Sequence, residues 1–357
     1  MTRKGFTLIE LMVGSAIMVV LVLGALMIYS RSNKISADQQ QYVELQNDVR
    51  AAMFFIARDV RMAGAGIPSA FAGYVIQGFD NETGANGITP DRLRIMGNIS
   101  DPLLLTITKC PGNSGKFDFN DYSFEQNAGY PDSFYLGRTV LVLPKAGSSC
   151  IGATVRTISR VNHNAGGTNE AFDTSAPPAG LSLPGGLSDV CADTEYAPGG
   201  TLTLIDVNEY WVDVTGSVSG LTAGVNGYIG GGTGGVLYAT KNGVYYPLAQ
   251  NIETLQFQYN GDFDADGTMD GFTNWNASWT KTQVAAVRQV RIIVVGRTRD
   301  AFASIAKVPV SSLYLYRRPP AANTPAATSD DWHKRFLLET TSTLRNASMN
   351  IYNLGMR

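Results

Sequence analysis

The N-terminal part of the chain begins with an almost unbroken apolar run. From Phe6 to Tyr29 every residue is apolar or small, apart from Glu10. A helix that crosses a bilayer needs about 20 such residues, so the run is long enough. It is longer than the apolar core of a secretory signal, about 7–15 residues, and no A-x-A cleavage site follows it. The pattern therefore predicts a membrane-spanning helix.

Beyond Tyr29 the apolar residues recur at helical spacing, with polar residues between them. These positions are Ile35, Tyr42, Leu45, Val49, Met53, Ile56 and Val60. The Gly- and Pro-containing stretch 64–68 then ends the pattern. One continuous helix from Phe6 to about Met62 is predicted, whose second half lays an apolar stripe on a globular domain. An independent coiled-coil stalk is the alternative, but the pattern lasts under about four heptads.

The remainder of the chain shows short β-like runs separated by turn residues. The candidate strands are residues 93–96, 103–107, 134–143, 154–160, 201–214, 236–248, 254–259, 284–298, 308–316 and 336–346. Asn242-Gly243 between apolar flanks predicts a two-residue hairpin. The Gly-rich stretches 164–189 and 216–235 predict surface loops. The expected fold class is α+β, with a long N-terminal helix packed on a loop-rich antiparallel β domain.

Glu10 is a carboxylate inside the apolar run, where no Lys, Arg or His can pair with it. Such a charge costs a few kcal/mol in a bilayer and needs a partner. Arg3 and Lys4 precede the run and should stay cytoplasmic. Cleavage after Gly5 would remove them and create an α-amino group on Phe6, which is cationic at neutral pH. The Phe6 amine of a neighbouring subunit would then compensate Glu10 in a shared apolar core.

The segment from Lys4 to Val13, KGFTLIELMV, resembles the class III signal of type IV prepilins and type II secretion pseudopilins. The resemblance implies that a prepilin peptidase cuts after Gly5 and N-methylates Phe6. It also implies that Glu10 is the family's N-terminal assembly acid. The alternative is a plain signal anchor with an incidental Glu10. The basic head, Gly, Phe and Glu at matching offsets make that alternative the weaker one.

Three later segments resemble PilW-type minor pilins. They are Ala57–Gly64 (ARDVRMAG), Asn251–Tyr259 together with Val287–Ile292, and Thr340–Asn346 (TTSTLRN). J-type pseudopilins of type II secretion share the first of them, and residues 70–250 match only in general character. The resemblance implies four parts: a leader at 1–5, a transmembrane helix half at 6–30, an amphipathic half at 31–66 and a globular β-rich pilin domain at 67–357.

A minor pilin of this type implies a structural role in assembly. The expected function is to initiate type IV pilus assembly in a tip complex with other minor pilins and the major pilin. A J-type pseudopilin is one alternative, and a tip adhesin whose Gly-rich loops bind a surface is another. The expected location is the inner membrane, with the N-terminus cytoplasmic and the domain periplasmic, and then the pilus at the cell surface.

An acidic loop lies between Tyr259 and Val287. Its carboxylates occupy positions 1, 3, 5 and 9 of a calcium loop, with Gly267 at position 6 for the sharp turn. The candidate calcium ligands are Asp262, Asp264, Asp266, Thr268 and Asp270. Thr273 stands at position 12, where a bidentate Glu is usual. A solvated acidic turn remains the alternative, because Asp-Gly is also turn chemistry.

The net charge, the cysteines and the histidines indicate which other functions the sequence can support. A net charge of -2 indicates no nucleic-acid partner. Of three cysteines, Cys110, Cys150 and Cys191, an exported domain would pair two, and Cys150 with Cys191 is the favoured disulfide, although spacing cannot give the connectivity. His163 and His333 have no nucleophile and base pattern around them, so no enzyme is expected.

Overall fold

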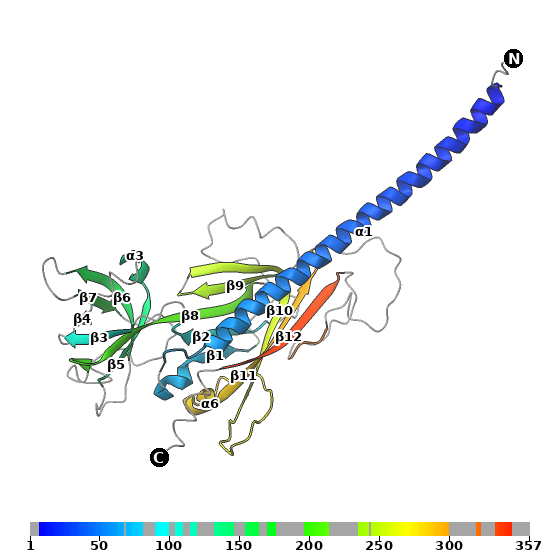
Figure 1. Cartoon of the computed structure of the whole chain (residues 1–357). Helices are drawn as coiled ribbons and strands as arrows, with labels where there is room; N and C mark the ends of the chain where they lie inside the picture. Colours follow the sequence, from blue (N-terminus) through cyan, green and yellow to red (C-terminus); the bar gives the residue numbers. More distant parts are fainter. Residues whose placement is uncertain are drawn as a thin grey trace.

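A single long helix projects from a β-rich body in the computed structural model (Figure 1). The helix α1 spans Leu8–Met62, and the remaining elements form the body around its C-terminal half. The predicted α+β fold is confirmed. The structure describes residues 7–67, 69–80, 90–99, 104–109, 115–119, 132–145, 154–163, 170–175, 196–213, 235–242, 244–299, 319–322 and 333–344.

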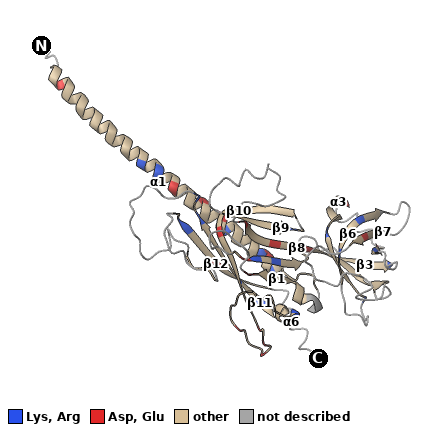
Figure 2. Ribbon diagram, turned by 180° about the vertical axis from the view of Figure 1, so that it is seen from behind, with Lys and Arg blue, Asp and Glu red and all other residues tan. Residues whose placement is uncertain are grey.

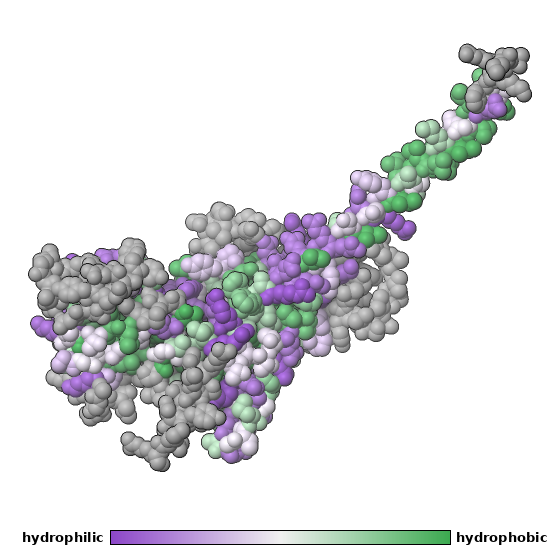
Figure 3. All heavy atoms as spheres, viewed as in Figure 1, coloured by the Kyte–Doolittle hydropathy of each residue, from purple (hydrophilic) through white to green (hydrophobic). Residues whose placement is uncertain are grey.

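The first half of α1 stands free of the body. Its most apolar 18-residue window has a mean hydropathy of 2.7 and is 0% buried. In Figure 3 most of this half is green, with some purple near its tip, whereas the β body carries mixed colours. At 1.5 Å per residue the 55 residues of α1 extend about 82 Å. The predicted continuous helix is therefore confirmed, with the apolar half outside the fold.

The second half of α1 buries the predicted stripe against the sheet. Its buried residues are Leu45, Val49, Ala52, Met53, Ile56, Ala57, Asp59 and Val60. Burying an apolar side chain of this size contributes about 1.5–3 kcal/mol. Gly296 of the sheet allows the close approach, because a Cβ there would lie 2.6 Å from Leu45 Cδ1 and 2.7 Å from Val49 Cγ2. Packing on the sheet therefore holds this half of the helix in place.

The main sheet carries α1 and is antiparallel throughout. Its strand order is β1-β2-β8-β9-β10-β11-β12. The bounds are β1 Ile76–Phe79, β2 Arg92–Gly97, β8 Thr201–Asp213, β9 Gly235–Lys241, β10 Val244–Gly261, β11 Val287–Arg297 and β12 Arg335–Thr343. Two short helices, η1 (Ser69–Tyr74) and α6 (Lys281–Ala285), pack against each other beside β1.

A second β layer closes on itself as a small barrel. Its ring order is β8-β3-β4-β7-β6-β5, and β5 returns to pair with β8. The bounds are β3 Leu104–Lys109, β4 Lys116–Phe119, β5 Thr139–Leu143, β6 Thr154–His163 and β7 Glu170–Ser175, with α3 (Asp132–Tyr135) beside them. The first half of β8 belongs to this barrel and its second half to the main sheet. Figures 1 and 2 place the barrel at the end of the body away from the N-terminus.

Side-chain alternation separates the two cores. Val140 and Val142 of β5 point into the barrel core, with Phe117 and Phe172. Leu141, between them, belongs to the main core instead. Successive residues of a strand face opposite sides, so one strand contributes to both cores. The barrel thereby packs its outer wall against the core that holds α1.

Most local predictions are confirmed, and three are wrong at least in part, among them the strand 284–298, whose beginning lies in α6. The Asn242 turn joins β9 to β10, and Asn242 has the positive φ of 50° that such a turn requires. Residues 236–248 and 254–259 fall in β9 and one long β10. The stretch 134–143 is no single strand, because α3 occupies its beginning, and the expected loop 164–189 contains β7. The expected strand 308–316 lies outside the described residues.

Candidate functional site

Glu10 lies in the first turn of α1 and closes a capping box with Thr7. The Glu10 carboxylate accepts hydrogen bonds from the Thr7 backbone N–H and from the Thr7 hydroxyl, both at 3.0 Å. The Thr7 hydroxyl accepts in turn from the Glu10 N–H at 3.4 Å. This capping box was not predicted above, although the Thr-x-x-Glu spacing is its usual sequence signature. Gly5 and Phe6, the predicted cleavage residues, lie outside the described residues.

The surroundings of Glu10 are apolar and fully open. Along the free half of α1, exposed fractions include 78% for Leu8 and 68% for Leu11. After Glu10 the next charged residue of α1 is Arg31, and Figure 2 shows the uncharged stretch between them. An exposed apolar surface of this extent marks a membrane or protein partner. Glu10 is therefore an exposed carboxylate on an apolar surface, and contact with such a partner would remove it from water.

Asp59 anchors the C-terminal half of α1 to the main sheet. Its side chain is almost fully buried and accepts from the Tyr210 hydroxyl at 2.6 Å and from Asn208 Nδ2 at 2.8 Å. Arg58 donates to the other carboxylate oxygen at 2.9 Å. Burial, together with the Asp59 charge, raises the pKa of the Tyr210 hydroxyl, which keeps its proton for this bond. The acid in the ARDVRMAG segment is thus a structural anchor.

Further polar contacts fix the end of the helix. The Ser342 hydroxyl of β12 donates to the Ala57 carbonyl at 3.0 Å. Past the last turn, the Gly64 N–H donates to the Met96 carbonyl at 2.8 Å, and Gly64 takes a φ of 79° that suits glycine. Residues 57–64 and 340–344 therefore meet at the helix–sheet interface, although they are far apart in sequence.

The acidic loop gathers three of its carboxylates. Ligand oxygens of Asp262, Asp264 and Asp270 lie within 4.8 Å of one another, so this triad could bind a metal. Asp266 is turned to Thr268 instead, and accepts from the Thr268 N–H and hydroxyl at 2.7 Å each. These bonds lower the pKa of Asp266. The sequence prediction placed all five residues in one ligand set, whereas the structure brings together the three.

Thr273, at the position of the usual twelfth ligand, closes the loop through its backbone. Its N–H and carbonyl exchange hydrogen bonds with Tyr259 at 2.9 Å and 2.7 Å. The Asp270 N–H donates to the Gly261 carbonyl at 2.9 Å, and the Asp270 carboxylate accepts from the Phe263 N–H at 2.7 Å. One β-bridge and the two Asp270 hydrogen bonds therefore hold the loop together.

The other candidate residues contribute no further site. Cys110, Cys150 and Cys191 lie outside the described residues, so the proposed disulfide stays a prediction. His333 Nδ1 lies 2.7 Å from the Thr298 carbonyl and ties the end of β11 to the start of β12. His163 ends β6, and its side chain is not among those described.

Comparisons with known proteins match both ends of the chain. The family described as Type IV Pilus-assembly protein W matches residues 232–346, and the Prokaryotic N-terminal methylation motif matches residues 1–26. Pilin-like protein PilA3 of Thermus thermophilus is 35% identical over 63 residues, which span 18% of this chain and 27% of that protein. The structure of the Type IV-like pilin TTHA1219 from Thermus thermophilus aligns with a TM-score of 0.20 and 14% identity, over 60% of this chain and 90% of that one.

A long N-terminal helix with a free apolar half, packed on an antiparallel sheet, defines a type IV pilin-like protein. Its methylation motif implies processing by prepilin peptidase and assembly with other pilins. Residues 232–346 are similar to the PilW family of type IV pilus-assembly proteins, so the resemblance covers about a third of the chain. Members of the pilin family are structural proteins, generally without enzymatic activity.

Proposed function

We propose that this protein is a minor pilin that initiates type IV pilus assembly, within a tip complex that also contains other minor pilins. The observation that carries the proposal is Glu10 at the base of a helix half that is wholly exposed and apolar. Such a helix is stable only in a bilayer or against other subunits. The protein would wait in the inner membrane with its domain in the periplasm, and then pass into the filament and reach the cell surface.

Charge pairing provides the assembly step. Processing after Gly5 exposes the Phe6 amine, and that amine of one subunit meets Glu10 of the next in the apolar filament core. Because the local dielectric is low there, the pair fixes the register of neighbouring helices. The β body, held by the Asp59 anchor, then follows the helix as one unit.

Replacing Gly5 by a bulky residue, as in Gly5→Trp, should block processing and pilus entry together. The uncleaved chain would retain residues 1–5 and would stay in the membrane fraction. Mass spectrometry of the membrane-bound subunit measures the difference directly. Gly14→Ala is the matched control, because Gly14 lies just outside the Lys4–Val13 segment and an added Cβ would have nothing within 4 Å. A Gly5→Trp chain of mature mass in sheared pili would contradict the proposal.

Two alternatives share the same assembly physics. A J-type pseudopilin would use the helix to build a secretion pseudopilus, and secretion genes beside this gene would favour it. A tip adhesin would bind a surface through the Gly-rich loops. A mutant that makes pili but fails to attach would favour the adhesin.

We also propose that the acidic loop takes up calcium as a structural cation. The triad of Asp262, Asp264 and Asp270 supplies the hard oxygen ligands that calcium prefers. Asp266 and Thr268 belong to the same loop and would complete the ligand set. Calcium would brace the connection between β10 and β11. Its binding to the folded state alone would raise stability by mass action.

The melting temperature of the full chain in detergent tests the calcium site. Calcium at about 100 times its dissociation constant should add about 2.7 kcal/mol, a rise of a few degrees over chelator. Asp264→Asn should abolish the rise, and magnesium should produce less of it. Equal melting with calcium and with chelator would remove the proposal, while leaving the pilin assignment intact.

A further inference from the structure

Two basic residues, Arg31 and Lys34, mark the end of the apolar half of α1. No charged residue stands between Glu10 and Arg31. Both basic side chains are exposed, and the first residue of α1 that is not exposed is Asp38, followed by the first buried one, Leu45. Figure 2 shows the basic patch on α1 just before the helix reaches the β body. Arg31 and Lys34 therefore lie on free helix, between the apolar half and the folded domain.

The length of α1 places this basic patch at the headgroups of a bilayer. The helix rises about 35 Å from Leu8 to Arg31 and about 39 Å from Leu8 to Lys34, at about 1.5 Å per residue. The hydrocarbon core of a bilayer is about 30 Å thick, and the bilayer measures about 40–45 Å with its headgroups. With Leu8 at one edge of the core, Arg31 lies about 5 Å and Lys34 about 9 Å beyond the other edge. Tyr29, which is 66% exposed, precedes them, and tyrosine is enriched at membrane interfaces.

The two basic side chains are placed to share one anionic group. Residues three apart on a helix lie on the same face, with Cβ atoms about 5–6 Å apart. Within the described part of the chain neither Arg31 nor Lys34 forms an ion pair, although Asp38 lies one turn beyond Lys34. Guanidinium and ammonium groups bind phosphate oxygens through charge-assisted hydrogen bonds. A headgroup with net negative charge would supply the counter-charge, whereas a zwitterionic headgroup would bring a cation of its own to the patch.

We propose that Arg31 and Lys34 bind an anionic phospholipid, of the phosphatidylglycerol class, in the outward-facing leaflet of the inner membrane. The inference rests on the membrane stage of the proposed function. Anionic headgroups attract basic residues that stand next to a membrane span. Cleavage after Gly5 removes Arg3 and Lys4 from the other end of the span, so Arg31 and Lys34 become the basic residues nearest to it. The lipid contact would hold the processed subunit at a fixed depth until it enters the filament.

Native mass spectrometry of the full chain in detergent tests the site, with phosphatidylglycerol as the anionic probe and phosphatidylcholine as the zwitterionic one. Every chain, the parent included, carries Arg3→Gln and Lys4→Gln, so that the basic residues of the leader do not contribute. Arg31→Gln and Lys34→Gln should each raise the Kd of the first bound phosphatidylglycerol about fivefold, the loss expected for one basic residue at a membrane surface. The Kd of phosphatidylcholine should not change. Both side chains are exposed, so these variants should fold as the parent does.

Arg50→Gln is the matched control, because Arg50 is an exposed basic residue of the same helix, about 24 Å beyond Lys34. It should bind phosphatidylglycerol as the parent does. The proposal is overturned if the parent binds both lipids equally, or if the chain with both Arg31→Gln and Lys34→Gln binds phosphatidylglycerol as tightly as the parent. Either result leaves the membrane stage intact, because lipids of both classes still bind the apolar half of α1. A parent chain that retains neither lipid overturns the proposal and contradicts the membrane stage as well.

Discussion

Glu10→Gln should abolish entry of this subunit into pili while leaving its processing largely intact. Gln at this position can still close the capping box with Thr7, so the helix start survives and the charge alone is lost. The Phe6 amine of the neighbour would then be buried without a counter-charge, which costs a few kcal/mol. A loss of about 3 kcal/mol corresponds to a fall of about a hundredfold in incorporation. Quantitative immunoblots of membranes and sheared pili measure the ratio.

Two further variants separate charge from helix capping. Thr7→Ala removes the cap but keeps the Glu10 carboxylate, and should enter pili nearly as the parent does. Glu10→Ala removes both and should behave as Glu10→Gln does. If Glu10→Gln instead assembles at the parental level, the charge-pairing role of Glu10 is refuted.

Asp59→Ala should cause a large loss of stability at the helix–sheet interface. The change leaves the Tyr210 hydroxyl and the Asn208 amide without their acceptor in a buried site, and it opens a cavity. We expect the free energy of unfolding to fall by about 3 kcal/mol. Urea unfolding of the full chain in detergent, followed by tryptophan fluorescence, gives the value.

Glu44→Ala is the control for the Asp59 experiment, since Glu44 is exposed on the same helix. It should change the free energy of unfolding by less than about 0.5 kcal/mol. Tyr210→Phe removes one donor of the same cluster and should cost less than Asp59→Ala. An Asp59→Ala chain as stable as the control would show that the apolar stripe alone holds the helix.

The sequence predicted those helices and strands whose formation depends on residues close together in the chain. The helix followed from its apolar run and stripe, the β9–β10 hairpin from Asn242-Gly243, and β12 from its alternating residues. The Asp59 anchor could not be read in this way. Its partners Asn208 and Tyr210 stand 149 and 151 residues further along the chain, so their meeting depends on the tertiary fold.

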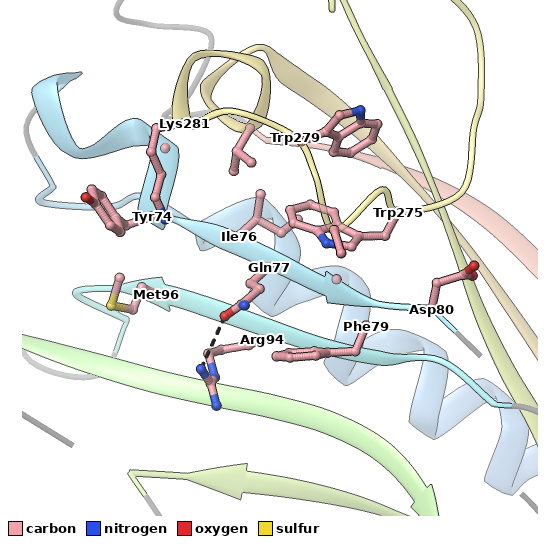
Figure 4. Close-up of a pocket in the computed structure, with 14 residues that line it drawn as sticks. Tyr74, Ile76, Gln77, Phe79, Asp80, Arg94, Met96, Trp275, Trp279 and Lys281 are labelled. Carbon is pink, nitrogen blue, oxygen red and sulfur yellow. Dashed lines mark hydrogen bonds between the residues drawn. The ribbon is translucent and has the colours of Figure 1, made fainter. Parts of the chain in front are cut away.

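The barrel was not predicted from the sequence, for a related reason. β4 has only four residues, and β7 lies in a stretch rich in Gly, Pro and Ser, so neither shows a clear strand pattern. Each is stabilised by strands distant in sequence, as where Phe117 of β4 pairs with Phe172 of β7. The barrel strands β3 to β7 also lie outside residues 232–346, which match the PilW family. Trp275 and Trp279 lie within that match, but only the fold brings them beside β1, where they line a cavity of about 520 Å³ (Figure 4).

The N-terminal residue of the subunit, sequenced from purified membranes and from sheared filaments, tests the central claim most directly. Charge pairing requires an amine on Phe6, so the mature chain in the filaments should begin with N-methylated Phe6. A filament subunit that begins at Met1 and still carries Arg3 and Lys4 would contradict it, because Glu10 would then have no amine to meet.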